Sequence, residues 1–259
     1  MFKDIYFFTL TFYKNDDIGN VRSKLAISCF KNILELGSKL IVIDGESTHQ
    51  DFLREMARLK EKYKDNFILE TKPELCMSGS RLYGLQKAIQ ISDENSIFFC
   101  TDPEKSGLIT KENILNCIKP IIEGKADIVI PQRSDVTFET MPSFQKIVEQ
   151  GCNEQFNKLF MKFDKKILDY WIGVRIFNKR ALESFLNYKP NREYPWGFLF
   201  ISLMMAKKEG LKFASSENNV EFDYHVLTQI EEGNESFNYK RILQTATLFA
   251  EFGKMNTLI

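Results

Sequence analysis

The sequence reads KLIVIDGEST at residues 39–48, an apolar run of strand length that passes directly into acidic and hydroxyl side chains. Similar apolar runs lie along the chain at 5–11, 66–71, 96–101 and 126–131. Segments with helical spacing of apolar residues separate these runs, at 17–36, 50–63, 80–91 and 111–123. Strands that alternate with helices form a parallel sheet covered on both faces. The sequence therefore predicts an α/β fold with a doubly wound, mainly parallel sheet flanked by helices.

The second half of the chain loses this alternation after Arg133. In chain order it predicts a helix at 142–163, a short apolar segment at 170–177, and helices at 179–188, 195–209 and 237–252. No repeat and no linker rich in Pro, Gly or Ser separates the halves, and 259 residues with 44% apolar side chains suit one large domain. We expect a single domain over residues 1–259.

The composition narrows the choice of partners and compartment. Lys plus Arg and Asp plus Glu each number 35, so no net charge attracts nucleic acid or an anionic membrane. The five cysteines are scattered and form no CxxC pair, which favours free thiols in a reducing compartment, and we expect a cytoplasmic protein. No run of about 18 apolar residues occurs, so no transmembrane segment is predicted. Residues 5–11 predict a buried strand and not a signal peptide.

Polar residues that directly follow the strands are the candidate ligand-binding residues, because ligands of open α/β sheets lie beyond the carboxyl ends of the strands. Asp44, Glu46 and Ser47 follow the second strand and could hold a ribose or a base; an ordinary turn is the alternative. Asp102 and Glu104 follow the fourth strand, two residues apart, and could share Mg²⁺ or Mn²⁺. A turn with solvated charges is the alternative there.

Two further residues could join this site. Arg81 lies near the start of the third helix, after Gly79, and could place a cation near the same strand ends. His225 could supply a nitrogen ligand to the same metal, but a lone histidine is more often structural. The sequence contains none of the patterns GxGxxG, GxxxxGK[ST] and GxSxG, so it predicts no dinucleotide fingerprint, P-loop or hydrolase triad.

Taken in order, five segments resemble motifs of the GT-A glycosyltransferases, in the large inverting family that includes the polyprenyl-phosphate mannosyl- and glucosyltransferases. The resemblance covers roughly residues 3–226. The segments are IVIDGEST at 41–48, similar to "VIVVDDGSTD"; GSR at 79–81 with Gly84 and Ala88, similar to "GxARNxGxxxA"; DPE at 102–104, in the place of an Asp-x-Asp metal motif; ADIVIPQRS at 126–134, similar to "ADIVIGSR"; and DYWIGVRIF at 169–177, similar to "DxxSGFRxF". Five motifs in one order are far more specific than any one of them.

The resemblance implies a GT-A nucleotide-diphospho-sugar transferase fold in three parts. Residues 1–133 would form the nucleotide-binding half, 134–236 the acceptor-side half and 237–259 a C-terminal amphipathic helix. It also implies a metal-dependent enzyme in which Asp102 and Glu104 hold Mn²⁺ or Mg²⁺, with His225 as the further ligand considered above. Asp102 would then be a catalytic residue.

The resemblance further implies how the donor is held and activated. Arg81 or Arg175 would steady the diphosphate. The segment PWGFLFIS at 195–202 lacks the acidic residue that relatives place there as a base, so Glu193 or Asp169 would be the base if the reaction inverts configuration. Some GT-A enzymes retain configuration without an evident base, and the stereochemistry stays open. Glu104 stands where the family has a second Asp, and its longer side chain changes the geometry of metal binding.

We therefore expect a glycosyltransferase that moves a sugar from a nucleoside diphosphate sugar to an acceptor not identified by the sequence: a small molecule, a lipid phosphate or a glycan. Peripheral membrane contact stays open. A non-catalytic nucleotide-sugar binding module is one alternative. A sugar-phosphate nucleotidyltransferase is another, disfavoured because residues 12–15 lack the Gly-rich, Arg-bearing loop that such chemistry needs.

Overall fold

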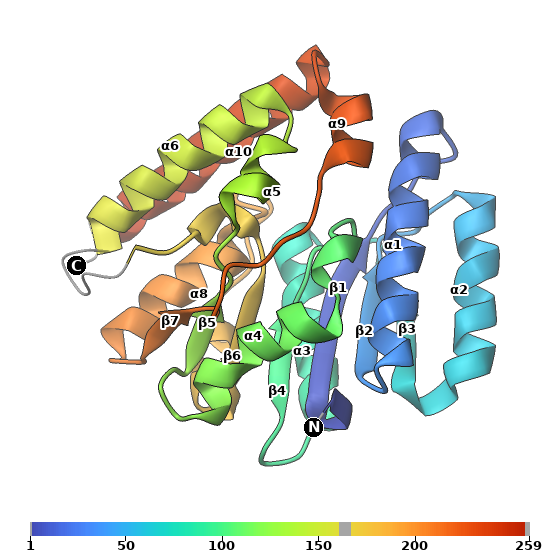
Figure 1. Ribbon diagram of the computed structural model, residues 1–259, viewed down its shortest axis with the longest axis horizontal. Helices are drawn as coiled ribbons and strands as arrows, with labels where there is room; N and C mark the ends of the chain where they lie inside the picture. The colour runs from blue at the N-terminus through green and yellow to red at the C-terminus, as the bar shows by residue number, and fades with distance from the viewer. Residues whose placement is uncertain (1, 161–166, 257–259) are drawn as a thin grey trace.

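The computed structural model describes residues 2–160 and 167–256, and the strands in this part of the chain form one seven-stranded sheet (Figure 1). Across the sheet they follow the order β3-β2-β1-β4-β6-β5-β7. Their bounds are β1 Ile5–Thr11, β2 Lys39–Asp44, β3 Phe67–Thr71, β4 Ile97–Cys100, β5 Ile128–Ile130, β6 Arg175–Asn178 and β7 Phe213–Ser215. Neighbouring strands are parallel except β6, which runs antiparallel to β4 and β5. The predicted α/β fold with a mainly parallel sheet is confirmed.

The register of the parallel strands gathers polar residues at one edge of the sheet. Strands β1, β2 and β4 are buried almost throughout, which explains their uninterrupted apolar sequences. Thr11 of β1 pairs with Asp44 of β2, and Asp44 pairs with Thr71 of β3. The loops that follow these strands therefore start side by side.

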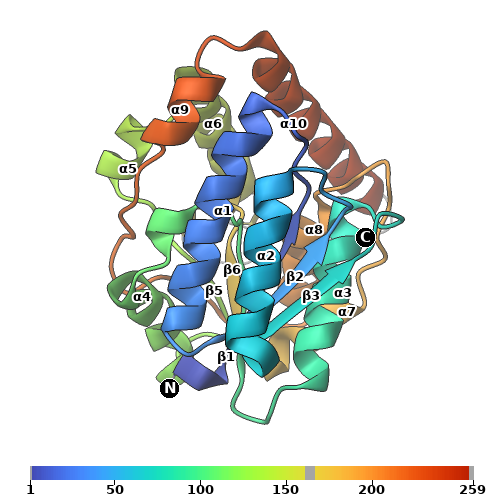
Figure 2. The same ribbon diagram turned by 90° about the vertical axis from the view of Figure 1, so that its right-hand side faces the viewer.

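Helices cover both faces of the sheet (Figures 1 and 2). Helices α1 and α2 pack beside each other on one face, and α3, α7 and α8 contact one another on the other face. Side-chain caps start several of the helices; for example, Asp16 accepts the N–H of Gly19 at α1, and Thr110 accepts the N–H of Asn113 at α4. The bounds are α1 Asp17–Glu35, α2 Gln50–Tyr63, α3 Met77–Gln90, α4 Lys111–Ile122, α7 Leu182–Leu186 and α8 Gly197–Lys208.

Three more helices lie over the carboxyl edge of the sheet: α6 (Ser143–Phe160) and α10 (Glu235–Asn256) run side by side, and α9 (His225–Glu231) contacts α1 (Figure 1). Aromatic packing holds this layer in place. The ring of Phe156 on α6 lies 5.1 Å from that of Phe200 on α8 and 4.7 Å from that of Phe252 on α10, between ring centroids. The apolar contacts fix α6 and α10 as a wall above the strand ends.

The sequence pattern does not predict three short elements: α5 (Asp135–Glu139), β7 and α9. Elements of 5, 3 and 7 residues are too short to show a hydrophobic period. Strand β6 overlaps the predicted apolar segment at 170–177 and extends one residue beyond it, and its antiparallel direction depends on contacts distant in sequence. The helix predicted at 142–163 is observed over Ser143–Phe160, and its last three predicted residues lie outside the described residues.

The five cysteines are free thiols, and four of them are buried, as the sequence predicts. Within residues 2–160 and 167–256, no helix has both the length and the apolar character needed to span a membrane.

A buried carboxylate joins α10 to the segment between α7 and α8. Glu251 on α10 accepts a hydrogen bond of 3.4 Å from the Tyr188 hydroxyl, and its Oε2 atom has no hydrogen-bond partner. Burial raises the pKa of Glu251 from 4.5 to about 7. Gly197 leaves room for both groups, because a Cβ there would lie 2.1 Å from the Tyr188 hydroxyl and 2.6 Å from Oε2.

We predict that Glu251→Gln stabilises the protein above neutral pH. The folded-state pKa of about 7 exceeds the ordinary value of 4.5, so the contribution of Glu251 is present below about pH 4.5 and is lost as the pH rises through 7. In urea unfolding, the variant should exceed the wild type by about 1–2 kcal/mol at pH 8 and by much less at pH 5. The exposed Glu235→Gln on the same helix is the control. An equal difference at both pH values would contradict the prediction.

Candidate functional site

A cleft of about 330 Å³ opens at the carboxyl edge of the sheet. Its floor consists of the end of β1, at residues 10–13, and the loop after β4, at 102–105. Helix α3 adds Met77 and Arg81, while α6, α8, α9 and α10 supply the walls. The cleft therefore lies where the two halves of the chain meet, at the position that the strand-end rule predicts.

Nine charged side chains line the cleft. The cations are Arg22, Arg81, Lys105, Lys240 and Arg241, and the carboxylates are Asp102, Glu104, Glu149 and Glu231. Sequence reasoning identified Arg81, Asp102 and Glu104 and missed the rest, because Arg22 lies within α1 and Lys240 and Arg241 lie within α10. No motif marks a charged residue inside an amphipathic helix as part of a site.

Asp102 lies in the cleft directly after β4, as predicted, and its carboxylate already forms an ion pair with the side chain of Lys105. Its Oδ2 atom accepts a hydrogen bond of 2.6 Å from the Lys105 ammonium, and its Oδ1 atom accepts one of 3.3 Å from the Glu104 N–H. Burial raises the pKa of Asp102, but the positive charges of Lys105 and Arg81 lower it by more, so it lies well below its ordinary value. Asp102 is therefore ionised and paired.

Glu104 faces a second cation in the same cleft. The Nη1 atom of Arg22 lies 3.3 Å from Glu104 Oε2, and the same guanidinium forms an ion pair with Glu231. Burial raises the pKa of Glu104, Arg22 opposes the shift and Asp102 adds to it, so the pKa lies above its ordinary value. Glu104 therefore takes up a proton more readily than an exposed glutamate.

The structure does not bring Asp102, Glu104 and His225 together as a metal site. The described residues contain no group of three His, Cys, Asp or Glu side chains that could hold a metal ion. His225 starts α9 with an exposed side chain, and its N–H donates to Asp223. Because Asp102 is paired with Lys105 and Glu104 lies against a guanidinium, these carboxylates, as the structure arranges them, do not fit Mn²⁺ or Mg²⁺.

Asp169, one predicted base, is buried in an ion-pair network behind the cleft. Its oxygens accept hydrogen bonds from Arg133 Nε at 2.6 Å, Arg133 Nη2 at 2.8 Å and the Asn153 amide at 2.6 Å. Burial raises the pKa of Asp169, but Arg133 lowers it by more, so it lies below its ordinary value. A carboxylate with a lowered pKa and both oxygens occupied is a poor base. We therefore assign Asp169 a structural role.

Arg175 and Glu193, two other predicted site residues, do not line the cleft. Glu193 lies on the loop before α8, and its side chain is 73% exposed. Arg175 is fully buried, and its guanidinium donates to three backbone carbonyls, those of Tyr170, Val174 and Leu199. The guanidinium N–H groups that would bind a diphosphate are therefore already bonded to these carbonyls. Arg175 therefore holds the loop before β6 in place.

The turn after β2 shapes the cleft without lining it. Buried Asp44 accepts hydrogen bonds from the Thr11 hydroxyl at 2.6 Å, the Ser47 hydroxyl at 2.6 Å and the Ser47 N–H at 2.7 Å. The Ser47 hydroxyl in turn accepts the Tyr13 N–H at 2.8 Å. Since Thr11 and Tyr13 line the cleft, Asp44 and Ser47 fix the position of its floor. Glu46 is exposed, with a φ of 70°, outside the lining.

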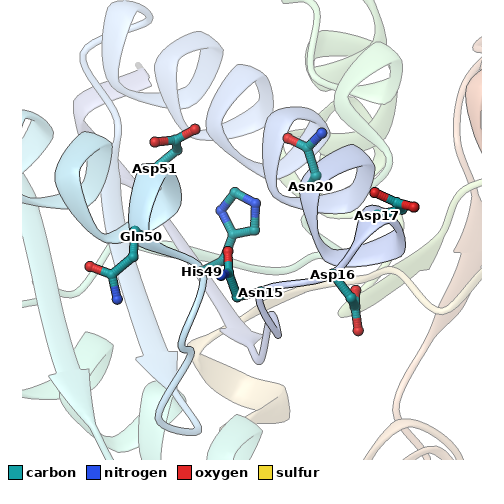
Figure 3. A pocket seen from close by; sticks show the side chains of 7 residues that line it. All are labelled: Asn15, Asp16, Asp17, Asn20, His49, Gln50 and Asp51. Carbon is teal, nitrogen blue, oxygen red and sulfur yellow. The ribbon is translucent and has the colours of Figure 1, made fainter.

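A second pocket, of about 300 Å³, lies between the starts of α1 and α2 (Figure 3). Its charged lining consists of Asp16, Asp17 and Asp51 and includes no Lys or Arg. His49 lies between the two helices and caps α2, accepting the Phe52 N–H at its Nδ1 atom. Such a lining repels an anion, so the cleft is the better site for a phosphorylated ligand.

Buried hydrogen-bond donors without acceptors concentrate at the cleft. Within the part of the chain that the structure describes, eight buried side-chain N or O atoms have no hydrogen-bond partner. Arg and Trp nitrogens are donors only, and an unsatisfied buried group costs about 1–3 kcal/mol. The cleft is therefore suited to a ligand rich in acceptor oxygens. Six of the eight atoms belong to residues that line it: Tyr13 Oη, Arg22 Nε, Arg81 Nε, Arg81 Nη1, Trp171 Nε1 and Arg241 Nε.

Comparison with known proteins gives structural matches alone, since no family model and no curated protein matches the chain. A mycobacterial protein superposes with a TM-score of 0.54 and 16% identity over 96% of this chain and 74% of that chain. Glucosyl-3-phosphoglycerate synthase from Mycobacterium tuberculosis, solved with phosphoglyceric acid, gives 0.50 and 13% over 96% and 80%. A mannosyltransferase from Pyrobaculum calidifontis, solved with GDP-Man and Mn²⁺, gives 0.50 and 14% over 94% and 69%.

These similarities establish the fold. The chain has the α/β fold of the GT-A glycosyltransferases, as its five motifs predict. At identities of 13–16%, the comparisons assign no role to individual residues.

We predict that Asp169→Asn lowers the free energy of unfolding by about 3 kcal/mol, because it removes a charged partner from the buried Arg133 guanidinium. Chemical denaturation at pH 7 measures the loss. The exposed Asp51→Asn is the matched control and should stay close to the wild type. A change below about 0.5 kcal/mol for Asp169→Asn, the range of ordinary surface substitutions, would show that the network is not needed for stability.

Proposed function

We propose that the cleft binds a nucleoside diphosphate sugar and transfers its sugar to an acceptor hydroxyl or phosphate. The observation that carries this proposal is the concentration of unpaired buried donors at the cleft. A diphosphate offers the acceptor oxygens and negative charge that such donors need. The fold supports the same ligand class, because one solved structure with this fold contains GDP-Man.

Arg81 is the residue best placed to bind the diphosphate. Its side chain is 8% exposed, and its Nε and Nη1 atoms have no partner although it lines the cleft. A guanidinium binds phosphate oxygens through parallel N–H bonds. When the bond between the sugar carbon and the diphosphate oxygen breaks, negative charge grows on that oxygen, and a fixed cation stabilises it.

Glu104 is the carboxylate that we propose as the general base. Its raised pKa brings it closer to the working range of a base, and Arg22 at 3.3 Å orients it. The acceptor proton would move to Glu104 while the acceptor oxygen forms its bond to the sugar and the nucleoside diphosphate leaves. This role replaces those expected of Asp169 and Glu193.

Asp102 and the turn residues Asp44 and Ser47 have supporting roles in this proposal. Asp102 orients the Lys105 ammonium, and the turn holds the floor of the cleft. The divalent cation expected from the motif would have to displace Lys105 from Asp102 and Arg22 from Glu104 to bind between these carboxylates.

A non-catalytic nucleotide-sugar binding module is the second candidate. It is favoured by the start of α8, where the buried run at 197–203 contains no acidic residue. Release of free sugar from the donor, or its transfer to an added acceptor, distinguishes the two functions. Nucleotide binding without either reaction would favour the binding module.

We predict that Arg81→Gln weakens the binding of UDP and GDP roughly ten- to hundredfold, the equivalent of about 1.5–3 kcal/mol for hydrogen bonds to a charged group. Isothermal titration calorimetry measures the dissociation constants. Arg54→Gln, on the exposed surface of α2, is the control and should leave them unchanged. Unchanged binding in Arg81→Gln would show that Arg81 does not hold the diphosphate.

A further inference from the structure

The loop after β4 holds a side-chain cation where the GT-A motif predicts a metal. Lys105 follows Asp102 by three residues, its N–H donates to the Asp102 carbonyl at 3.2 Å, and its ammonium lies 2.6 Å from Asp102 Oδ2. The Lys105 side chain is 11% exposed. Gly173 lies beside the ammonium, because a Cβ added there would be 3.7 Å from it. The ammonium is therefore shielded, whereas the Asp102 side chain, which lines the cleft, is 37% exposed.

The second carboxylate of the motif is also occupied. Glu104 lies 3.3 Å from Arg22, and Arg22 is held in turn by Glu231. A divalent cation between Asp102 and Glu104 would have to break both of these contacts and then remain close to two displaced cations. Repulsion at such short distances opposes metal binding.

The cleft contains more cations than carboxylates free to pair with them. Of its four carboxylates, Glu149 is bonded at 2.7 Å to Arg133, which lies behind the cleft. The remaining three carboxylates face five cations. Lys240 forms no ion pair with the described residues. Burial lowers its pKa, the charges of Arg22 and Arg241 lower it further, and the charges of Glu104 and Glu231 offset only part of this shift. An anion in the cleft would relieve this repulsion.

We infer that the cleft's own cations, Lys105 and Lys240 together with Arg81, neutralise the diphosphate of the donor, so that donor binding needs no divalent cation. This inference rests on the proposed function and departs from the metal dependence that the motif implies. Lys105 would provide positive charge at the position where the motif places the metal. Asp102 would hold that ammonium in place, which makes it a positioning residue.

Calorimetry with UDP and GDP as probes tests the inference, in buffer with EDTA and in buffer with Mn²⁺. For the wild type we expect dissociation constants that agree within about twofold between the two buffers. For Lys105→Met we expect roughly tenfold weaker binding in EDTA, and a partial recovery with Mn²⁺ because the Asp102 oxygens become free to bind the metal. Lys125→Met, a substitution on the surface loop before β5, is the control and should behave as the wild type.

The outcomes separate the inference from the proposed function. Wild-type binding that is lost in EDTA and restored by Mn²⁺ would overturn the inference and leave the proposed function standing. Binding in EDTA that Lys105→Met does not weaken would overturn the role of Lys105. No binding of either nucleotide in either buffer would overturn the proposed function, and the inference with it. Circular dichroism of each variant shows whether it is folded.

Discussion

The second half of the fold depends on the ion pairs and hydrogen bonds of one buried group, the guanidinium of Arg133. It extends from the end of β5 and bonds to Asp169 before β6, Glu149 on α6 and the hydroxyl of Tyr224 just before α9. A charge removed from water is tolerated only when its donors are satisfied, so these three segments must meet around it. Because α6 and α9 form walls of the cleft, the hydrogen bonds that satisfy this one buried cation determine the shape of the ligand site.

The cleft in front of this network differs from it in whether its hydrogen-bond donors have acceptors. In the network the Nε, Nη1 and Nη2 atoms of Arg133 all donate to carboxylates, whereas in the cleft donors of Arg81 and Trp171 have no acceptors. Such groups oppose folding, and the aromatic packing around Phe156, whose ring lies 5.7 Å from that of Trp171, helps to hold this wall of the cleft in place. Donors fixed before a ligand arrives need little reorganisation when negative charge develops on the leaving diphosphate. The unsatisfied donors cost free energy in folding, and a transferase site can use the same donors to stabilise developing negative charge.

Much of the fold and part of the site could be predicted from the sequence, for a physical reason. Buried parallel strands appear as uninterrupted apolar runs, and the strand-end rule then locates Asp102 and Glu104. Arg81 is found near the start of the third helix, close to the same strand ends. Lys240 and Arg241 reach the cleft only because α10 folds back over the sheet, which no local pattern records. Arg175 shows the reverse case, since it matches a motif while its hydrogen bonds serve backbone carbonyls.

The motif at 102–104 shows how one adjacent residue changes the chemistry that a pattern indicates. Two carboxylates at a strand end attract a divalent cation because their negative charges add. The turn at Pro103 brings Lys105 back onto Asp102, and this ion pair cancels one of the two charges locally. Arg22, from a distant helix, opposes the other. The same loop then favours an anion over a cation. The sign of the charge that the site binds therefore depends on Arg22 and Lys105 as much as on the motif itself.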